Sequence, residues 1–251
     1  MKVLDNPNTI TENLIANSAI SHGMRVLDFG CGNGETSKLL AKAVGESGEV
    51  VGVDINENAV IQAREKLTLE GYKNCRFIHT DISDRLEKLD YFDAVFGRRV
   101  LMYVPDQNKV LSTLSSLLKA GGVICLQESD STIVPASTDL LPLHDKVNGW
   151  VWETVKAEGG NVNTGFMLPS ILSNCGFKVE SIKAEAIIQG QNLHYPMSTV
   201  VRAILPRIVE KGIATESEID IENLDDRLKN ERDKNQVFIS DLVFSVIAIK
   251  V

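Results

Sequence analysis

The chain has 251 residues, 43% of them hydrophobic and 24% charged, which is ordinary for a globular protein that buries an apolar core. Its 26 basic and 34 acidic residues give a formal net charge of −8, and this balance argues against a nucleic-acid partner or an anionic membrane surface. The length favours a single domain over residues 1–251.

Targeting and cysteine signals point to the cytoplasm. The first residues, MKVLDNPNT, contain no apolar signal segment, and no apolar run reaches the roughly 20 residues that span a membrane. The four cysteines (Cys31, Cys75, Cys125 and Cys175) lie far apart, without the paired spacing of a zinc site. We therefore expect a cytoplasmic protein with reduced thiols, no membrane insertion and no bound metal.

Residues 24–128 alternate short apolar runs with amphipathic stretches. The runs that we expect to form strands are 24–29, 50–54, 75–79, 93–97 and 123–127. The expected helices are 35–44, a helix capped by Asn56 and stopped by Gly71, and 106–119, which Gly121-Gly122 ends. This alternation is typical of a parallel sheet with helices on both faces. Right-handed crossovers then bring the loops after the strands to one edge, where ligands bind.

The regular alternation of apolar runs and amphipathic stretches ends after Glu128. A short helix over 168–175 and strands over 178–189 and 242–251 continue the pattern, but two irregular segments interrupt it. These segments are 129–165, with a helical stripe near its end, and 190–236, with two expected helices. We expect both segments to be insertions that form a lid over the ligand-binding edge.

The loop after the first strand carries the strongest motif, a G-x-G-x-G turn formed by Gly30, Gly32 and Gly34 before a helix. Glycines let a ligand approach the backbone closely, and the helix N-terminus favours negative groups. A dinucleotide fingerprint requires a third glycine where Glu35 stands. Asp28, two residues before the first glycine, suits a ligand that presents a cation, such as the ammonium of an amino acid.

Acidic residues also end the next two strands. Asp54 is placed to accept hydrogen bonds from both ribose hydroxyls of an adenosine, although a turn aspartate at a strand end is equally common. Asp81 can accept from an adenine amino group, and the backbone of Ile82 can serve the ring nitrogen. Apolar residues within 96–106 would form one wall of the ligand site.

These segments, VLDFGCGNGE, VVGVDINENAV, TDIS, FDAVFGRRVLMYVPD and LKAGGVICLQE, resemble the motifs of class I S-adenosylmethionine-dependent methyltransferases of the small-molecule type. The resemblance implies a Rossmann-like α/β fold with a seven-stranded, mostly parallel sheet, a reversed last hairpin and 24–128 as the cofactor-binding core. It also implies cofactor contacts. Gly30, Cys31, Gly32 and Gly34 would approach the methionine part, Asp54 the ribose, Ile55, Asp81 and Ile82 the adenine, and Arg98 the amino-acid end. FGRRV is similar to quinone methyltransferases, but LMYVP departs from them, so that substrate is not carried over.

The expected chemistry is in-line transfer of an activated methyl group to a small-molecule acceptor. Orientation alone contributes roughly 7–11 kcal/mol to such a reaction, and a base is needed only if the acceptor must lose a proton. The candidates at the acceptor end are Tyr103, Glu128, His144, His194 and Trp150 with Trp152. Tyr103 is equally a packing residue, His144 fits a core histidine better, and the tryptophans fit hydrophobic filling of the lid, so no catalytic base is assigned.

Two alternatives remain open at this level. One is a nicotinamide-dependent oxidoreductase on a similar sheet, which Glu35 disfavours. The other is a protein that binds S-adenosylmethionine, or its product S-adenosylhomocysteine, without turnover. The sequence leaves the oligomeric state, the acceptor and the methylated atom open.

Overall fold

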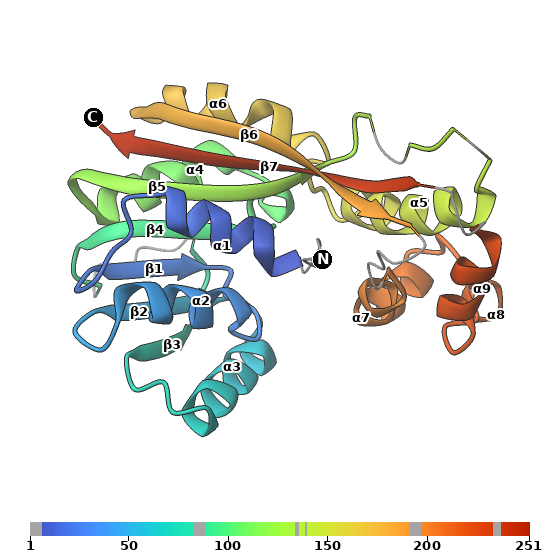
Figure 1. Ribbon diagram of the computed structural model, residues 1–251, viewed down its shortest axis with the longest axis horizontal. Helices are drawn as coiled ribbons and strands as arrows, with labels where there is room; N and C mark the ends of the chain where they lie inside the picture. Colours follow the sequence, from blue (N-terminus) through green and yellow to red (C-terminus); the bar gives the residue numbers. More distant parts are fainter. Residues whose placement is uncertain (1–6, 83–88, 134–135, 139, 191–196, 233–236) are drawn as a thin grey trace.

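The computed structural model describes residues 7–82, 89–133, 136–138, 140–190, 197–232 and 237–251 (Figure 1). Its centre is one seven-stranded sheet in the order β3-β2-β1-β4-β5-β7-β6. The strands are β1 (Arg25–Phe29), β2 (Glu49–Asp54), β3 (Cys75–His79), β4 (Phe92–Arg98), β5 (Leu118–Asp130), β6 (Phe177–Gln189) and β7 (Phe238–Lys250). The first five strands pair in parallel, and β7 runs antiparallel to both β5 and β6. The expected Rossmann-like sheet with a reversed last hairpin is confirmed.

Helices connect the strands and cover both faces of the sheet (Figure 1). They are α1 (Pro7–Asn17), α2 (Glu35–Val44), α3 (Glu57–Leu69), the 3₁₀ turn η1 (Leu101–Tyr103), α4 (Gln107–Leu117), α5 (Pro142–Ala157), α6 (Thr164–Asn174), α7 (Met197–Glu210), α8 (Glu216–Ile219) and α9 (Leu224–Glu231). Asn56 caps α3 as expected, because its side chain accepts a hydrogen bond from the Ala59 amide.

Three details differ from the sequence-based expectation. Helix α1 was not expected, and the described part of 190–236 contains α7, α8 and α9 rather than two helices. Helix α4 ends at Leu117, before Gly121-Gly122, because Leu118 is buried and pairs with Phe92 at the start of β5. Pairing of the chain with the neighbouring strand therefore outweighs the helical pattern there.

The core consists of two layers that follow from the alternation of side chains along the strands. Leu27 and Phe29 of β1 point to one face, where they join the buried residues of α4 and α6. Val26 of β1 points to the other face and packs with Leu40 and Val44 of α2 and with residues of α1. The central strands are therefore apolar on both faces, as their sequences indicate.

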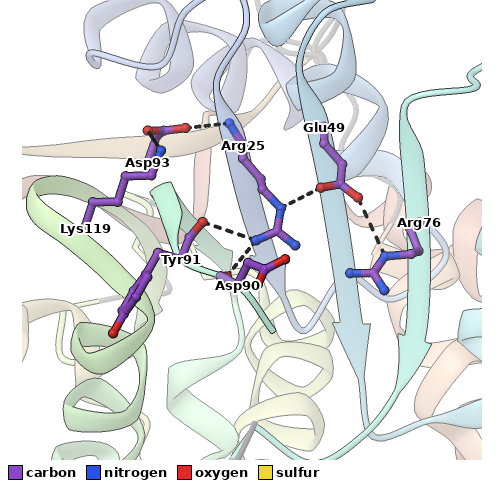
Figure 2. A network of polar contacts seen from close by, with 7 residues as sticks. All are labelled: Arg25, Glu49, Arg76, Asp90, Tyr91, Asp93 and Lys119. Atoms are coloured by element: carbon purple, nitrogen blue, oxygen red, sulfur yellow. Dashed lines mark hydrogen bonds and ion pairs between the residues drawn. The ribbon is translucent and has the colours of Figure 1, made fainter. Parts of the chain in front are cut away.

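A polar network joins the amino ends of the strands (Figure 2). The Arg25 guanidinium bonds to Glu49 at 2.6 Å and to the Asp90 carbonyl at 2.6 Å, and it lies 4.3 Å from the centre of the Phe92 ring. The Arg25 amide donates to Asp93, which also binds Lys119 at 2.5 Å. The cavity described below lies at the opposite, carboxyl edge of the sheet.

Helices α5, α7, α8 and α9 form a helical cluster of their own beyond the carboxyl ends of the parallel strands, on the right in Figure 1. Val147, Trp150, Val201, Ile208 and Leu224 are among its buried residues. None of the helices in the described ranges is long and apolar enough to cross a membrane.

Candidate functional site

A cavity of about 750 Å³ lies at the carboxyl edge of the sheet, between the strand ends and the helical cluster. Six of the residues selected from the sequence line it, namely Gly30, Asp54, Ile55, Asp81, Ile82 and Tyr103. They come from the ends of β1, β2, β3 and the turn after β4. Successive strand ends therefore contribute to one volume, as parallel topology requires.

The glycine loop is held close to β2 and leaves one side open. The amides of Gly30 and Cys31 both donate to the Val53 carbonyl, at 2.8 and 3.0 Å. Gly30 has a φ of +68°, and a Cβ there would come within 2.2 Å of the Val100 side chain. Gly32 also has a positive φ, +52°, but nothing lies within 4 Å of the place where its Cβ would stand. A ligand can therefore approach the backbone at Gly32.

Asp54 binds the backbone of two loops. Its Oδ2 accepts from the Gly32 amide at 2.8 Å, and its Oδ1 accepts from the Asn56 amide at 2.8 Å. The carboxylate thus joins the glycine loop to the start of α3 while it lines the cavity. The next side chain, Ile55, is 68% exposed, which is unusual for isoleucine and leaves an apolar surface at the cavity.

Asp28 and Arg98 lie beneath the loop and are not among the residues that line the cavity. Asp28 is buried and accepts a hydrogen bond from the Ser37 hydroxyl at 2.5 Å. Burial raises the pKa of Asp28 to about 7, with Ser37 and Arg98 acting in the opposite direction. The Arg98 guanidinium donates to Asn8 of α1 at 3.0 Å, so α1 closes this side of the site.

Cys31 and Gly34 also lie outside the cavity lining. Cys31 is 5% exposed, and burial raises the pKa of its thiol, so that it remains protonated. Gly34 precedes α2, and a Cβ there would come within 2.9 Å of Leu67. These two residues shape the loop through packing.

Glu128 positions the turn after β4. It is fully buried, and its carboxylate accepts hydrogen bonds from the amides of Val100, Leu101 and Met102 at 3.0, 2.8 and 3.3 Å. Burial raises the pKa of Glu128 to about 7 against these hydrogen bonds. Glu128 does not line the cavity, but it holds η1, which brings Tyr103 into it.

Arg99 lines the cavity and was not selected from the sequence, which favoured its neighbour Arg98. Its φ of +54° is unusual for a residue with a side chain. The guanidinium donates to Asp241 of β7 at 2.9 Å, and Asp241 also accepts from the Ser129 hydroxyl at 2.6 Å. The left-handed backbone at the strand end decides which of the two arginines faces the cavity, and no sequence pattern encodes this.

Two further residues outside the sequence-based selection, Glu158 and Arg207, meet in the cavity wall. Arg207 of α7 donates from Nε to Glu158 Oε1 at 2.7 Å, and its Nη2 donates to Oε2. The guanidinium carbon lies 5.7 Å from the centre of the Tyr103 ring. The two residues are 49 positions apart in the chain, and no sequence motif links them.

The structure places His144 and Trp150 in the helical cluster and not in the cavity lining. His144 Nδ1 lies 2.8 Å from Glu231 Oε2, and its ring packs 4.7 Å from the Phe238 ring centre. Trp150 is buried among the apolar residues of the cluster, and Trp152 packs with Met102, Val155 and Val162. His194 lies outside the described residues.

Comparisons with known proteins agree with this arrangement. A methyltransferase domain family model matches residues 20–197. A demethylmenaquinone methyltransferase of Staphylococcus aureus (strain MRSA252) is 36% identical over 115 residues, which are 45% of this chain and 47% of that protein. The similarity to this curated relative therefore spans about half the length of either chain.

Solved structures share the fold at low sequence identity. Phosphoethanolamine N-methyltransferase 2 of Haemonchus contortus, in complex with phosphomonomethylethanolamine and S-adenosylhomocysteine, superposes with a TM-score of 0.60 and 19% identity, covering 98% of this chain and 53% of that one. An Aquifex aeolicus methyltransferase gives 0.54 and 22%, covering 71% and 87%. The [4+2]-cyclase SpnF gives 0.61 and 18%, covering 97% and 81%.

The sheet order and the cavity at its carboxyl edge define a Rossmann-like α/β protein of the class I methyltransferase type. Since the family model covers more than half of the chain, the protein belongs to the methyltransferase domain family.

Proposed function

We propose that this protein transfers the methyl group of S-adenosylmethionine to a small-molecule acceptor. The observation that carries this proposal is the convergence of Gly30, Asp54 and Asp81, from three strand ends, around one cavity in a chain of this family. Its volume of about 750 Å³ is in the range of small-molecule sites. The [4+2]-cyclase SpnF has a similar fold, so the fold alone does not suffice to assign methyl transfer.

The residues present fit this cofactor. Asp54 would accept the ribose hydroxyls, Ile55 would pack on the adenine ring, and Asp81 with Ile82 would bind the adenine edge. Gly30, Cys31, Gly32 and Gly34 would surround the methionine part. Asp28 and Arg98 would compensate the ammonium and carboxylate of its amino-acid end. These assignments follow from family membership and from the order of the strand ends.

The bound cofactor would supply a methyl group on a sulfonium, which is already activated for transfer. The protein's own residues then have to orient the acceptor and exclude water. We infer that residues 24–128 bind the cofactor and that α5, α7, α8 and α9, from the segments 129–165 and 190–236, act as the lid of a single domain. Tyr103 lines the cavity where the turn η1 meets this helical cluster, and it would lie at the acceptor end.

The acceptor is not inferred from the curated relatives. They match less than half of this chain, and Arg207 lies beyond even the span of the family model. The net charge of −8 supports a small molecule over a nucleic acid. The cysteines, all of them free thiols, are compatible with the cytoplasmic location that we propose.

Calorimetric titration with S-adenosylhomocysteine tests the proposal. We expect saturable binding, with a dissociation constant raised about 10- to 100-fold in Asp54→Asn, because a charged hydrogen-bond acceptor is worth roughly 1.5–3 kcal/mol. Glu57→Gln, an exposed carboxylate three residues away in α3, is the matched control and should bind as the wild type does.

Two outcomes would contradict the proposal. Binding of NADH in preference to S-adenosylhomocysteine would support the oxidoreductase. Tight binding of the cofactor with no methyl transfer to any of a broad range of small acceptors would support a non-catalytic binding protein.

A further inference from the structure

Charged groups of both signs line the cavity, and among them the acids at two strand ends lie apart from two arginines. Asp106 and Lys109, at the start of α4, line it as well. Asp54 and Asp81 stand at the ends of β2 and β3, toward one side of the sheet. Arg99, after β4, and Arg207, from α7, stand toward the lid side. If the acids bind the adenosine part, as proposed above, the arginines face the acceptor. This end of the cavity therefore carries two guanidinium groups, together with the Glu158 carboxylate that pairs with Arg207.

We propose that the methyl acceptor is an apolar small molecule with an acidic oxyanion group, a carboxylate or a phosphate, that binds the outer edge of the Arg207 guanidinium. This proposal rests on the function proposed above and names the substrate class of the same site.

The geometry of Arg207 leaves that edge available. A guanidinium has five N–H donors in a planar fork. Glu158 takes the Nε and Nη2 side, and Nη1 has no hydrogen-bond partner within the described part of the chain. The Arg207 side chain is 38% exposed and lines the cavity, so its remaining donors are accessible from it. Two-oxygen acids match such a fork in a bidentate manner.

Glu158 acts as a positioning residue for this guanidinium. It directly follows α5, whereas Arg207 belongs to α7, so the pair also joins the two segments of the proposed lid. The Tyr103 ring lies under the guanidinium at 5.7 Å. Held on one edge by a carboxylate and on one face by an aromatic ring, Arg207 has little conformational freedom left to lose when an anion binds.

The apolar residues of the cavity wall favour an acceptor with an apolar body. Val100, Val104 and Val110, from the turn after β4 and from α4, line the same cavity. An acceptor that packs against them needs an apolar body, and its acidic group would be directed to the arginine side.

Titration of the protein saturated with S-adenosylhomocysteine tests this inference. The probes are benzoate, octanoate and phenyl phosphate, with benzamide as the uncharged counterpart of benzoate. We expect at least one acid to bind and benzamide to bind at least 10-fold more weakly. Comparison of the carboxylates with phenyl phosphate identifies which oxyanion the site prefers.

Variants then locate the bound acid. Arg207→Lys keeps the charge but loses the fork, and Arg207→Gln loses both, so we expect about 10-fold and 100-fold weaker binding of the acid, respectively. Arg202→Lys is the matched control, because Arg202 lies on the same helix in an exposed ion pair with Glu222 and does not line the cavity. It should leave the affinity for the acid unchanged.

The inference is overturned if no acid binds, if benzamide binds as well as benzoate, or if Arg207→Lys has no more effect than Arg202→Lys. Affinity for S-adenosylhomocysteine should stay at the wild-type value in all three variants. If the wild-type protein itself did not bind S-adenosylhomocysteine, that result would instead contradict the function proposed above. Repeating the acid titration without S-adenosylhomocysteine would still measure how much Arg207 contributes to binding of the acid.

Discussion

Two glycines of the same loop have similar backbone conformations but different surroundings. Gly30 and Gly32 both have positive φ values, +68° and +52°. Only at Gly30 does a side chain, that of Val100, occupy the space of a Cβ. The first glycine is therefore required for packing within the protein, and the second leaves room for a ligand.

We predict that Gly30→Ala lowers the free energy of unfolding by about 2–4 kcal/mol, through backbone strain and overpacking. Gly32→Ala should cost only about 1–2 kcal/mol, the strain alone, yet it should weaken S-adenosylhomocysteine binding. Urea denaturation and calorimetry measure the two effects. Adding Val100→Ala to Gly30→Ala should restore part of the stability, and equal losses in both single variants would contradict this reading.

A second residue-level prediction concerns the buried carboxyl of Asp28, whose pKa burial raises to about 7. The folded protein then binds the proton more tightly than the unfolded chain, whose aspartates titrate near about 3.9. The free energy of unfolding should fall as pH rises from about 4 to 7, by at most about 1.4 kcal/mol per pH unit, and then level off.

Urea denaturation of Asp28→Asn against the wild type, from pH 4.5 to 8, isolates this contribution. The variant should gain stability relative to the wild type as pH rises to about 7. Glu128, whose pKa burial also raises to about 7, is present in both proteins and cancels in the difference. Parallel stability curves would show that Asp28 is ionised in the folded protein throughout this range.

At the level of elements, the network at the amino ends of the strands holds β1 between β2 and the loop before β4 (Figure 2). Arg25 bonds to a carboxylate and to backbone carbonyls and contacts an aromatic ring. Arg76 makes only a contact of 3.7 Å with the same Glu49, and its side chain is 51% exposed. The two arginines differ in how many partners they hold.

We predict that Arg25→Ala lowers the free energy of unfolding by about 1–3 kcal/mol, because charge-assisted hydrogen bonds to the backbone are lost. Arg76→Ala should cost less than about 0.5 kcal/mol, as is usual for an exposed ion pair. Both values come from urea denaturation at one pH. A similar loss in the two variants would mean that the network contributes no more than an ordinary surface pair.

At the level of the whole molecule, a contact between the half-buried Glu231 and the buried His144 joins α9 to α5 in the helical cluster. Glu231 at the end of α9 accepts from the amides of Leu143 and His144 at the start of α5 and from the His144 ring. His144 Nε2 is buried and has no hydrogen-bond partner among the residues that the structure describes, so protonation would leave an N–H unsatisfied. Burial lowers the pKa of His144 below its ordinary value, although the Glu231 carboxylate acts against this.

Protonation of His144 destabilises the folded protein relative to the unfolded chain. Because the unfolded chain binds the proton more tightly, this contribution to stability is complete above about pH 6.5 and is lost as pH falls below it. We predict that amide hydrogen exchange in α5 accelerates relative to α2 between pH 6.5 and 5, after correction for intrinsic rates. His144→Gln should abolish the difference. Equal acceleration of both helices would exclude a local effect of His144.

The sheet and its connections could be predicted because they depend on local periodicity. Apolar runs in β1, β2 and β4 and the spacing of α2 and α3 indicate these elements from the local sequence pattern alone. The cavity edge followed from topology, since parallel strands bring Gly30, Asp54 and Asp81 to one side. Helix α1 and the start of β5 were missed because contacts with distant strands stabilise them.

The sequence by itself determined the class of fold, the family and three strand-end residues of the cavity, Gly30, Asp54 and Asp81, because these depend on motifs placed at strand ends. Only the tertiary structure decided the part of the cavity wall that Arg99, Glu158 and Arg207 form. It turns Arg99 rather than Arg98 into the cavity through a left-handed backbone, and it brings Arg207 to Glu158 across 49 residues. It also buries Glu128 beneath η1 and His144 in the helical cluster. Such contacts between remote segments have no periodicity, so they become visible only when the chain is folded.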